Sequence, residues 1–334
     1  MTDEVLRVLE TIVMLSLVIL TGLFLRRRKL LDKPSTERIS RFVADVAFPA
    51  LVFTSMLRSV DPQSMAESWY LPLMGVLLLL AGMGIGSLAA RCARGADAAT
   101  RGSAAFAVGT PNWLFVPLPI AIALYSEQGE RIVLLVNVGA LLIFWSVGVS
   151  VVRGTRPDAA SLRGLVVNPG LLATVLAVAA ALAFPAARTV ERLDITEVGI
   201  GLGAMSVVVQ AMAFLGDVTV PLAMVVTGSM LGDEDAEGLW SARITGLVAI
   251  RLVGFPVLVM LLLLLARTIG LHVETATATT LIIISAMPVA VTCSVVAEKY
   301  GGDVSLVSRA IFLSTMASVV TVPAIVWLGR ILAL

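Results

Sequence analysis

The chain has 334 residues, of which 58% are hydrophobic and 14% are charged. A soluble globular domain is closer to half apolar and a quarter charged, so these proportions exclude an ordinary soluble protein and indicate one embedded in a lipid bilayer. The net charge of +1 says nothing about partners, but the chain has no basic tract laced with aromatic residues, so no nucleic-acid partner is expected.

Ten apolar segments, each roughly 20 residues or longer, follow one another along the chain, and this length suits a helix that crosses the hydrocarbon core. Their uninterrupted runs of Leu, Val, Ala and Ile predict helices and not the short alternating segments of a barrel. The fold class expected is therefore an all-α polytopic membrane protein. The predicted spans are residues 5–25, 38–57, 69–91, 101–125, 131–152, 165–185, 200–231, 239–266, 277–299 and 304–330.

Lys and Arg are concentrated in alternate loops, most densely at Arg26–Lys29 after the first span. Cytoplasmic loops are enriched in these residues, so the distribution predicts that both termini lie outside. The expected location is the cell (inner) membrane, which the chain crosses several times.

The pattern Asp-Val-x-x-Pro begins at Asp45 and again at Asp217, each time in the second long apolar segment of its half. A carboxylate within a span is costly, and a duplicated hydropathy pattern is the signature of a secondary transporter built from two repeats. Five spans per half make the repeats inverted. The expected organisation is a five-helix repeat at residues 1–152, a cytoplasmic linker at 153–164 and an inverted five-helix repeat at 165–334.

Prolines interrupt the fourth and ninth spans, which hold corresponding places in the two halves. Interrupted segments at matching positions are the best sequence indication of a transporter's binding site, and the N-terminal ends of half-helices suit an anion. The simpler alternative is that the prolines only kink packed helices. The residues at the two interruptions include Thr110, Asn112, Pro119, Pro288, Thr292 and Cys293.

The sequence around these interruptions resembles the auxin efflux carrier (AEC) family. No single motif is specific, but the ordered set covers essentially the whole chain. The matching segments are Asn112–Ala121 with Tyr125–Gly129, Asn137–Gly139 with Phe144–Trp145, Asn168–Pro169, Gly216–Asp217 with Val220–Ala223, Ala286–Pro288 and Ala297–Asp303.

The resemblance implies the ten-helix fold shared with plant PIN carriers and related to bile-acid symporters, in which broken spans four and nine cross at the substrate site. It also implies a scaffold of spans 1, 2, 6 and 7, which forms a homodimer, and a moving transport domain of spans 3–5 and 8–10. Bacterial relatives are thought to carry small organic acids. The candidate substrate contacts are Asn112, Trp113, Thr110, Pro119, Pro288, Thr292, Cys293 and Asn137.

This chain departs from the family pattern at several positions near the expected crossing. Asp45 stands where members often have Asn, and Pro117 occupies a usual Gly. Ala140–Leu141 replaces a common Gln-Asn pair, and Thr292–Cys293 replaces a common Asn pair. These changes remove amide donors, so the identity of the substrate does not carry over from any relative.

Asp45, Asp217 and Arg251 are the ionisable residues placed most clearly inside spans. Pairing is the usual fate of such residues, and Asp217 with Arg251 is the candidate pair. The sequence leaves two roles open for Asp217: a structural strut, or a proton or sodium site that couples transport to an ion gradient.

The function expected is that of a secondary carrier for a small organic anion, working by an elevator-like alternating-access mechanism. The alternatives are a channel, since broken helices also line pores, and a non-transporting membrane receptor. An enzyme is not expected, because no nucleophile has a base beside it and no metal-binding His-Glu set is present. Primary transport is excluded, because the chain has no phosphate-binding Gly-x-x-x-x-Gly-Lys-Ser/Thr motif. With one His, at position 272, and two Cys, no metal site or cofactor is expected.

Overall fold

The computed structural model describes residues 3–59, 62–92, 97–155, 168–189, 195–232, 241–271 and 273–332. Most of the predicted linker 153–164 and His272 lie outside these residues. Within them the chain is helical, and the only extended pairing is an isolated bridge between Pro111 and Val289.

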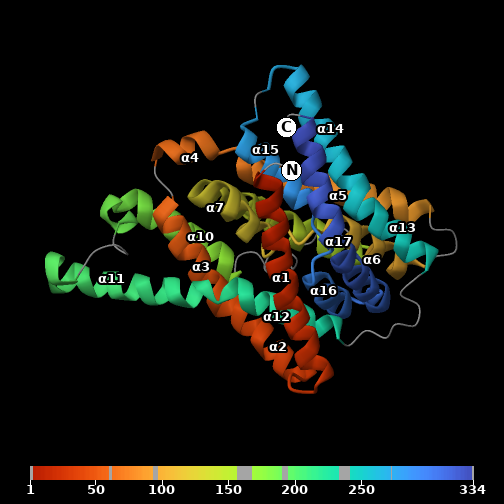
Figure 1. Ribbon diagram of the computed structural model, residues 1–334, viewed down its shortest axis with the longest axis horizontal. Coiled ribbons are helices and arrows are strands. Elements are labelled where there is room, and N and C mark those ends of the chain that lie inside the picture. Colours follow the sequence, from red (N-terminus) through yellow and green to blue (C-terminus); the bar gives the residue numbers. More distant parts are fainter. Residues whose placement is uncertain are drawn as a thin grey trace.

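The first half contains α1, α2, α3, α4, α5, α6, α7 and α8, with π-helical turns η1 and η2 between them (Figure 1). Their bounds are α1 Asp3–Arg27, α2 Lys33–Phe42, η1 Val43–Ala47, α3 Phe48–Ser59, α4 Pro62–Ser68, α5 Leu71–Cys92, α6 Ala98–Gly109, α7 Pro117–Ile143, η2 Phe144–Gly148 and α8 Val149–Arg153.

The second half contains α10 to α17, the short 3-10 turn η3 and the π-helical turn η5. Their bounds are α10 Pro169–Ala183, η3 Pro185–Arg188, α11 Ile195–Asp217, α12 Thr219–Leu231, α13 Ala242–Ala249, η5 Ile250–Gly254, α14 Phe255–Thr268, α15 Thr275–Ala286, α16 Thr292–Tyr300 and α17 Val304–Ile331.

Seven helical stretches in the described residues are long and apolar enough to cross a membrane. The prediction of an all-helical membrane protein is thereby confirmed, while the division into ten spans and two inverted repeats stays a prediction. The seven stretches are Leu6–Arg27, Lys33–Arg58, Ala66–Arg91, Pro117–Arg153, Gly203–Leu231, Ala242–Thr268 and Val304–Ile331.

Capping side chains explain where five of the described helices begin. Each cap accepts a hydrogen bond from an N–H group of the first turn that has no partner within the helix. The backbone N–H of Thr100, for example, donates to Asp97 at 2.7 Å and lowers the pKa of that carboxyl. All five caps stand at helix starts that the Lys and Arg distribution assigns to the cytoplasm. They are Asp32 for α2, Asp97 for α6, Asn168 for α10, Ser241 for α13 and Asp303 for α17.

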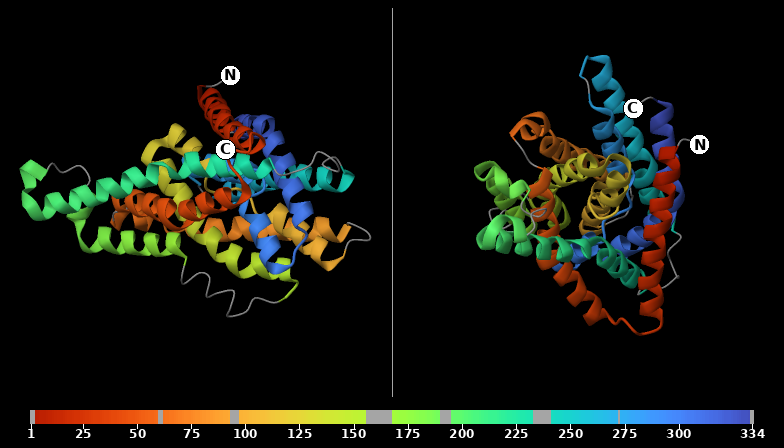
Figure 2. Two further views of the ribbon diagram at one scale, coloured as in Figure 1. Left: turned by 90° about the horizontal axis from the view of Figure 1, so that it is seen from below. Right: turned by 60° about the vertical axis from the view of Figure 1, so that its left-hand side comes forward.

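Two groups of helices make up the molecule. In one, α3 packs against α10 and α11, which lie along one side of the molecule, and α12 packs against α1 and α2 (Figures 1 and 2). In the other, α5 packs against α6 and α7, and α17 packs against α13, α15 and α16. Both chain ends lie at the same end of the molecule in Figure 1.

Glycine allows the backbones of α1 and α12 to touch. A Cβ atom on Gly22 would overlap the carbonyl oxygen of Val225, and one on Gly228 would overlap that of Ile19. Small residues at such crossings are the usual means by which membrane helices approach closely. This contact joins the first helix of the chain to one from its second half, and it borders the cavity described next.

Candidate functional site

Two non-helical stretches meet in the middle of the molecule, one between α6 and α7 and one between α15 and α16. Asn112 donates its backbone N–H to the carbonyl oxygen of Pro288 at 2.8 Å, and Ala290 donates to that of Thr110 at 3.0 Å. Backbone that leaves a helix at membrane depth must find partners inside the protein. Here each stretch supplies partners for the other, at the two places where the sequence predicts interruptions.

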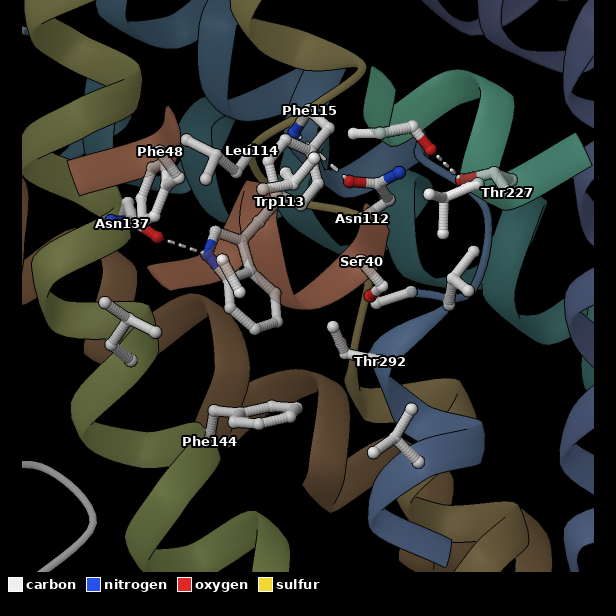
Figure 3. A pocket seen from close by; sticks show the side chains of 18 of the residues that line it. Ser40, Phe48, Asn112, Trp113, Leu114, Phe115, Asn137, Phe144, Thr227 and Thr292 are labelled. Atoms are coloured by element: carbon white, nitrogen blue, oxygen red, sulfur yellow. Dashed lines mark hydrogen bonds between the residues drawn. The ribbon is translucent and has the colours of Figure 1, made fainter. Parts of the chain in front are cut away.

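A cavity of ≈ 220 Å³ lies against both non-helical stretches (Figure 3). Its wall is mostly apolar, and none of its lining residues carries a charge. A largely apolar pocket with a few polar groups is the usual form of a small-molecule site. The polar side chains that line it are Ser40, Asn112, Asn137, Asn168, Thr227 and Thr292.

The side-chain oxygen of Asn112 stabilises the turn that follows it, and its side-chain nitrogen is free to donate a hydrogen bond. Its Oδ1 accepts the backbone N–H of Phe115 at 3.2 Å. Within the described residues, no partner is found for its Nδ2 group, although the side chain is 8% exposed. Because Asn112 lines the cavity, a ligand or water there can accept a hydrogen bond from this group. Asn112 is therefore a polar group of the cavity that can donate to a substrate.

Aromatic rings form one wall of the cavity. The Trp113 and Phe144 ring centroids lie 5.3 Å apart, and Phe144 and Trp145 lie 5.2 Å apart. A hydrogen bond fixes the orientation of the Trp113 ring, because its Nε1 donates to Oδ1 of Asn137 at 2.8 Å (Figure 3). Asn137 thus lines the cavity, as predicted for a site residue, but its oxygen is already used to orient Trp113.

The three π-helical turns found in the described residues all lie near this crossing. In η1, Val43 and Ala44 line the cavity, and in η2, Phe144 and Trp145 do so. The third, η5, holds Arg251. A π turn inserts one residue into a helix and is found frequently at functional sites.

The other predicted contacts lie around the crossing but do not line this cavity. Thr110 and Cys293 are fully buried beside it, and Pro119 lies in the first turn of α7. Pro288 borders a second cavity of ≈ 200 Å³, which is lined mostly by residues of α1 and α17. Of the predicted contacts, the structure therefore brings Asn112, Trp113, Asn137 and Thr292 to the main cavity.

The structure does not bring Asp217 and Arg251 together, which corrects the expectation of a buried pair. Asp217 ends α11 with its side chain exposed, and Asp45 is exposed as well. Arg251 is fully buried and donates to backbone carbonyl groups instead. The sequence gives the depth of a residue along a span, but not the face of the helix on which it lies.

Because Asp217 has no partner among the described residues, Asp217→Asn removes no contact, and we expect the free energy of unfolding to fall by no more than about 0.5 kcal/mol. Thermal unfolding of the purified variant measures this. A loss of several kcal/mol that Arg251→Leu partly restores would re-establish the strut that the sequence suggested.

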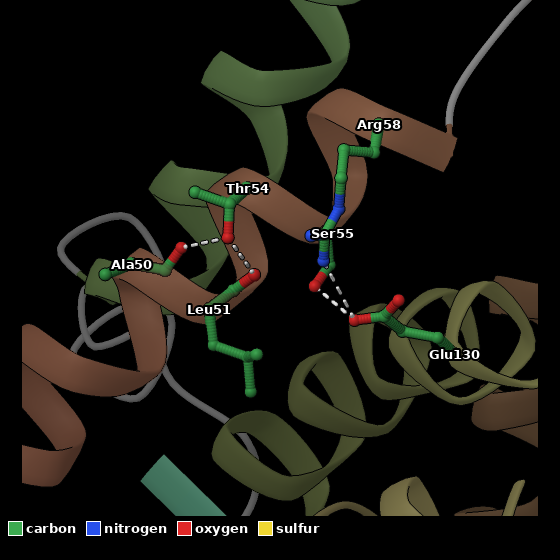
Figure 4. Close-up of polar contacts among 6 residues, drawn as sticks. All are labelled: Ala50, Leu51, Thr54, Ser55, Arg58 and Glu130. Atoms are coloured by element: carbon green, nitrogen blue, oxygen red, sulfur yellow. Dashed lines mark hydrogen bonds and ion pairs between the residues drawn. The ribbon is translucent and has the colours of Figure 1, made fainter. Parts of the chain in front are cut away.

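Glu130 is a buried carboxylate that the sequence analysis did not single out. Its Oε1 accepts a hydrogen bond from the hydroxyl of Ser55, and Nη2 of Arg58 lies 3.8 Å from the same oxygen (Figure 4). These contacts join α3 to α7 across the two helix groups. The sequence feature that relates to this contact is its partner Ser55, which begins a Ser-Met-Leu triplet that occurs again at Ser229.

Comparison with known proteins supports a transport role. The sequence model of the membrane transport protein family matches residues 7–326. The chain belongs to this family. The resemblance to auxin efflux carriers is thereby confirmed, and the family is one of transporters, not of enzymes. An "Uncharacterized transporter" of Methanothermobacter thermautotrophicus is similar to the chain, with 24% identity over 317 residues, which cover 94% of this chain and 96% of that protein.

Proposed function

We propose that this membrane transport protein is a secondary carrier that moves a small organic anion by alternating access, with the substrate bound in the cavity at the crossing. The observation that carries the proposal is the free Nδ2 donor of Asn112, next to the start of α16. Asn112 and the residues that lead into α16 belong to the two non-helical stretches, which exchange backbone hydrogen bonds. A movement of one stretch against the other would therefore change the geometry of the site.

The start of α16 favours an anion. Val291, Thr292 and Val295 line the cavity, so the first turn of the nine-residue helix α16 borders it. The N-terminal end of a helix carries the equivalent of roughly half a positive charge, which favours an anion. Figure 3 shows Thr292 and Asn112 around the same space. A carboxylate placed between them meets a positive helix end and an amide donor.

The uncharged wall favours a substrate with one carboxylate and an apolar body. A second carboxylate would lie against aromatic and aliphatic side chains with no cation to pair with, and such burial is costly. Phe48, Trp113 and Phe144 offer the apolar body a matching surface.

Thermal unfolding of the purified protein with a panel of small carboxylates tests this assignment. A ligand present at about 100 times its dissociation constant stabilises the folded state by about 2.7 kcal/mol. We expect monocarboxylates with aliphatic or aromatic bodies to raise the melting temperature more than dicarboxylates of equal size or the matching amines. Stabilisation by the amines alone would reject an anion site.

The contacts between helices support the division into scaffold and transport domain. In this proposal α1 to α3 and α10 to α12 form the scaffold and the homodimer, while α5 to α8 and α13 to α17 move past them like an elevator. The link from Ser55 and Arg58 to Glu130 joins the two parts. It must therefore break when the transport domain moves.

The proposed orientation has ten spans with both termini outside. We expect a cysteine introduced at Gln128 to react with a membrane-impermeant maleimide in intact cells, and one at Ser35 to react only after permeabilisation. Both variants are made after Cys92 and Cys293 are replaced by serine. The reverse labelling pattern would contradict the orientation.

A further inference from the structure

All three nitrogen atoms of the Arg251 guanidinium group donate hydrogen bonds to backbone carbonyl groups. Its Nε donates to the carbonyl oxygen of Met287 at 3.1 Å, its Nη1 donates to that of Val108 at 2.9 Å, and its Nη2 donates to that of Ser285. Its Cζ lies 4.5 Å from the centroid of the Phe255 ring. The side chain is 0% exposed, and no carboxylate pairs with it among the described residues.

These carbonyl groups belong to the C-terminal ends of the two interrupted helices. Val108 lies in the last turn of α6, Ser285 lies in the last turn of α15, and Met287 is the residue that follows α15. The C-terminal end of a helix carries the equivalent of roughly half a negative charge. Two such ends amount to about one negative charge, which balances the single positive charge of a guanidinium.

This balance explains how an arginine remains buried without an acidic partner. A buried charge is costly unless nearby groups of the opposite sign are fixed around it. The planar guanidinium holds several N–H groups in a rigid fork, so it reaches carbonyls of two helices at once. A lysine carries the same charge but not this geometry.

We infer that Arg251 is the built-in cation of the crossing: it neutralises the C-terminal ends of α6 and α15 and holds them together, so that the two non-helical stretches stay in register. Arg251 does not line the cavity, so it is a positioning residue. Arg251 thus neutralises the C-terminal ends of α6 and α15, while the N-terminal end of α16 remains available to bind the substrate. This division of the helix ends rests on the proposed function; the role of Arg251 at the C-terminal ends does not.

A free cation at the same place would compete with this arginine. Two positive charges near each other in a low-dielectric interior repel strongly. The wild-type protein should therefore need no sodium ion to hold the crossing. If the arginine side chain is truncated, the carbonyl groups lose their cation, and the space it leaves is shaped for a guanidinium ion.

The test is thermal unfolding of the purified protein, with guanidinium and sodium ions as probes. We expect Arg251→Ala to melt at least 5 °C below the wild type, and millimolar guanidinium chloride to restore part of that loss. The wild type should melt within 1 °C in sodium chloride and in choline chloride of equal ionic strength. Arg243→Ala, which removes an exposed arginine of α13, serves as the matched control and should gain nothing from guanidinium.

Three results would overturn the inference: an unchanged melting temperature in Arg251→Ala, a loss that guanidinium does not relieve, or a specific gain of the wild type from sodium. If Arg251→Ala does not fold, Arg251→Lys and Arg251→Gln decide the matter. Lysine should retain more stability than glutamine because it keeps the charge, and the opposite order would reject a role for charge. None of these measurements uses a substrate, so their failure differs from failure of the anion site.

Discussion

Replacing Asn112 with alanine is expected to weaken carboxylate binding at least tenfold while the protein still inserts and folds. The change removes the free Nδ2 donor in the cavity. A hydrogen bond to a charged group contributes about 1.5–3 kcal/mol, and each 1.4 kcal/mol is a factor of ten in the dissociation constant. Titration of the best carboxylate of the panel, followed by calorimetry or thermal shift, measures the loss.

Asn112→Asp separates binding from folding. The aspartate keeps the oxygen that accepts the Phe115 N–H, but it replaces the donor with a negative charge. We expect this variant to fold, because the turn keeps its acceptor, and to bind no carboxylate measurably. Gln128→Ala, which removes an amide far from the cavity lining, is the control and should bind normally. Normal binding in Asn112→Asp would exclude Asn112 as a contact.

Gly228→Val is expected to abolish folding, the largest effect on stability that we predict. Even a Cβ atom at Gly228 would overlap the carbonyl oxygen of Ile19, which is backbone and cannot rotate away. Inserting extra carbon atoms into packed sites typically costs 1–3 kcal/mol, and a clash of backbone with backbone exceeds that range because the two helices must separate. Size-exclusion chromatography of the detergent extract should show aggregated or degraded protein.

Gly84→Val supplies the matched control for this prediction. Gly84 also lies within a long apolar helix, α5, but a Cβ atom there would meet open space. This variant should purify as the wild type does. If both variants purified equally well, the close packing of α1 and α12 would not be needed for folding.

The sequence predicts the region of the site because proline leaves a direct mark on backbone structure. Pro111 and Pro288 stand in non-helical stretches, and Asn112, Trp113 and Thr292 beside them line the main cavity. Composition alone likewise predicts an all-helical membrane protein. These features depend on local residue types, which a single sequence displays.

Features that depend on distant partners were predicted poorly. Arg251 binds carbonyls that lie 143 and 36 residues away along the chain, and backbone carbonyls leave no trace in side-chain identity. Asp217 was expected to be buried, but it lies on an exposed face of its helix. Glu130 was overlooked because it stands at a predicted loop edge, where carboxylates are common.

Counterflow in proteoliposomes tests most directly whether the cavity at the crossing belongs to a carrier, as we propose, and not to a channel. Vesicles loaded with the unlabelled carboxylate that gives the largest thermal shift are diluted into a trace of the labelled compound. We predict transient, saturable accumulation of label that Asn112→Asp abolishes, with no unitary current in planar bilayers. Flux that rises linearly with concentration, together with single-channel openings, would contradict the account.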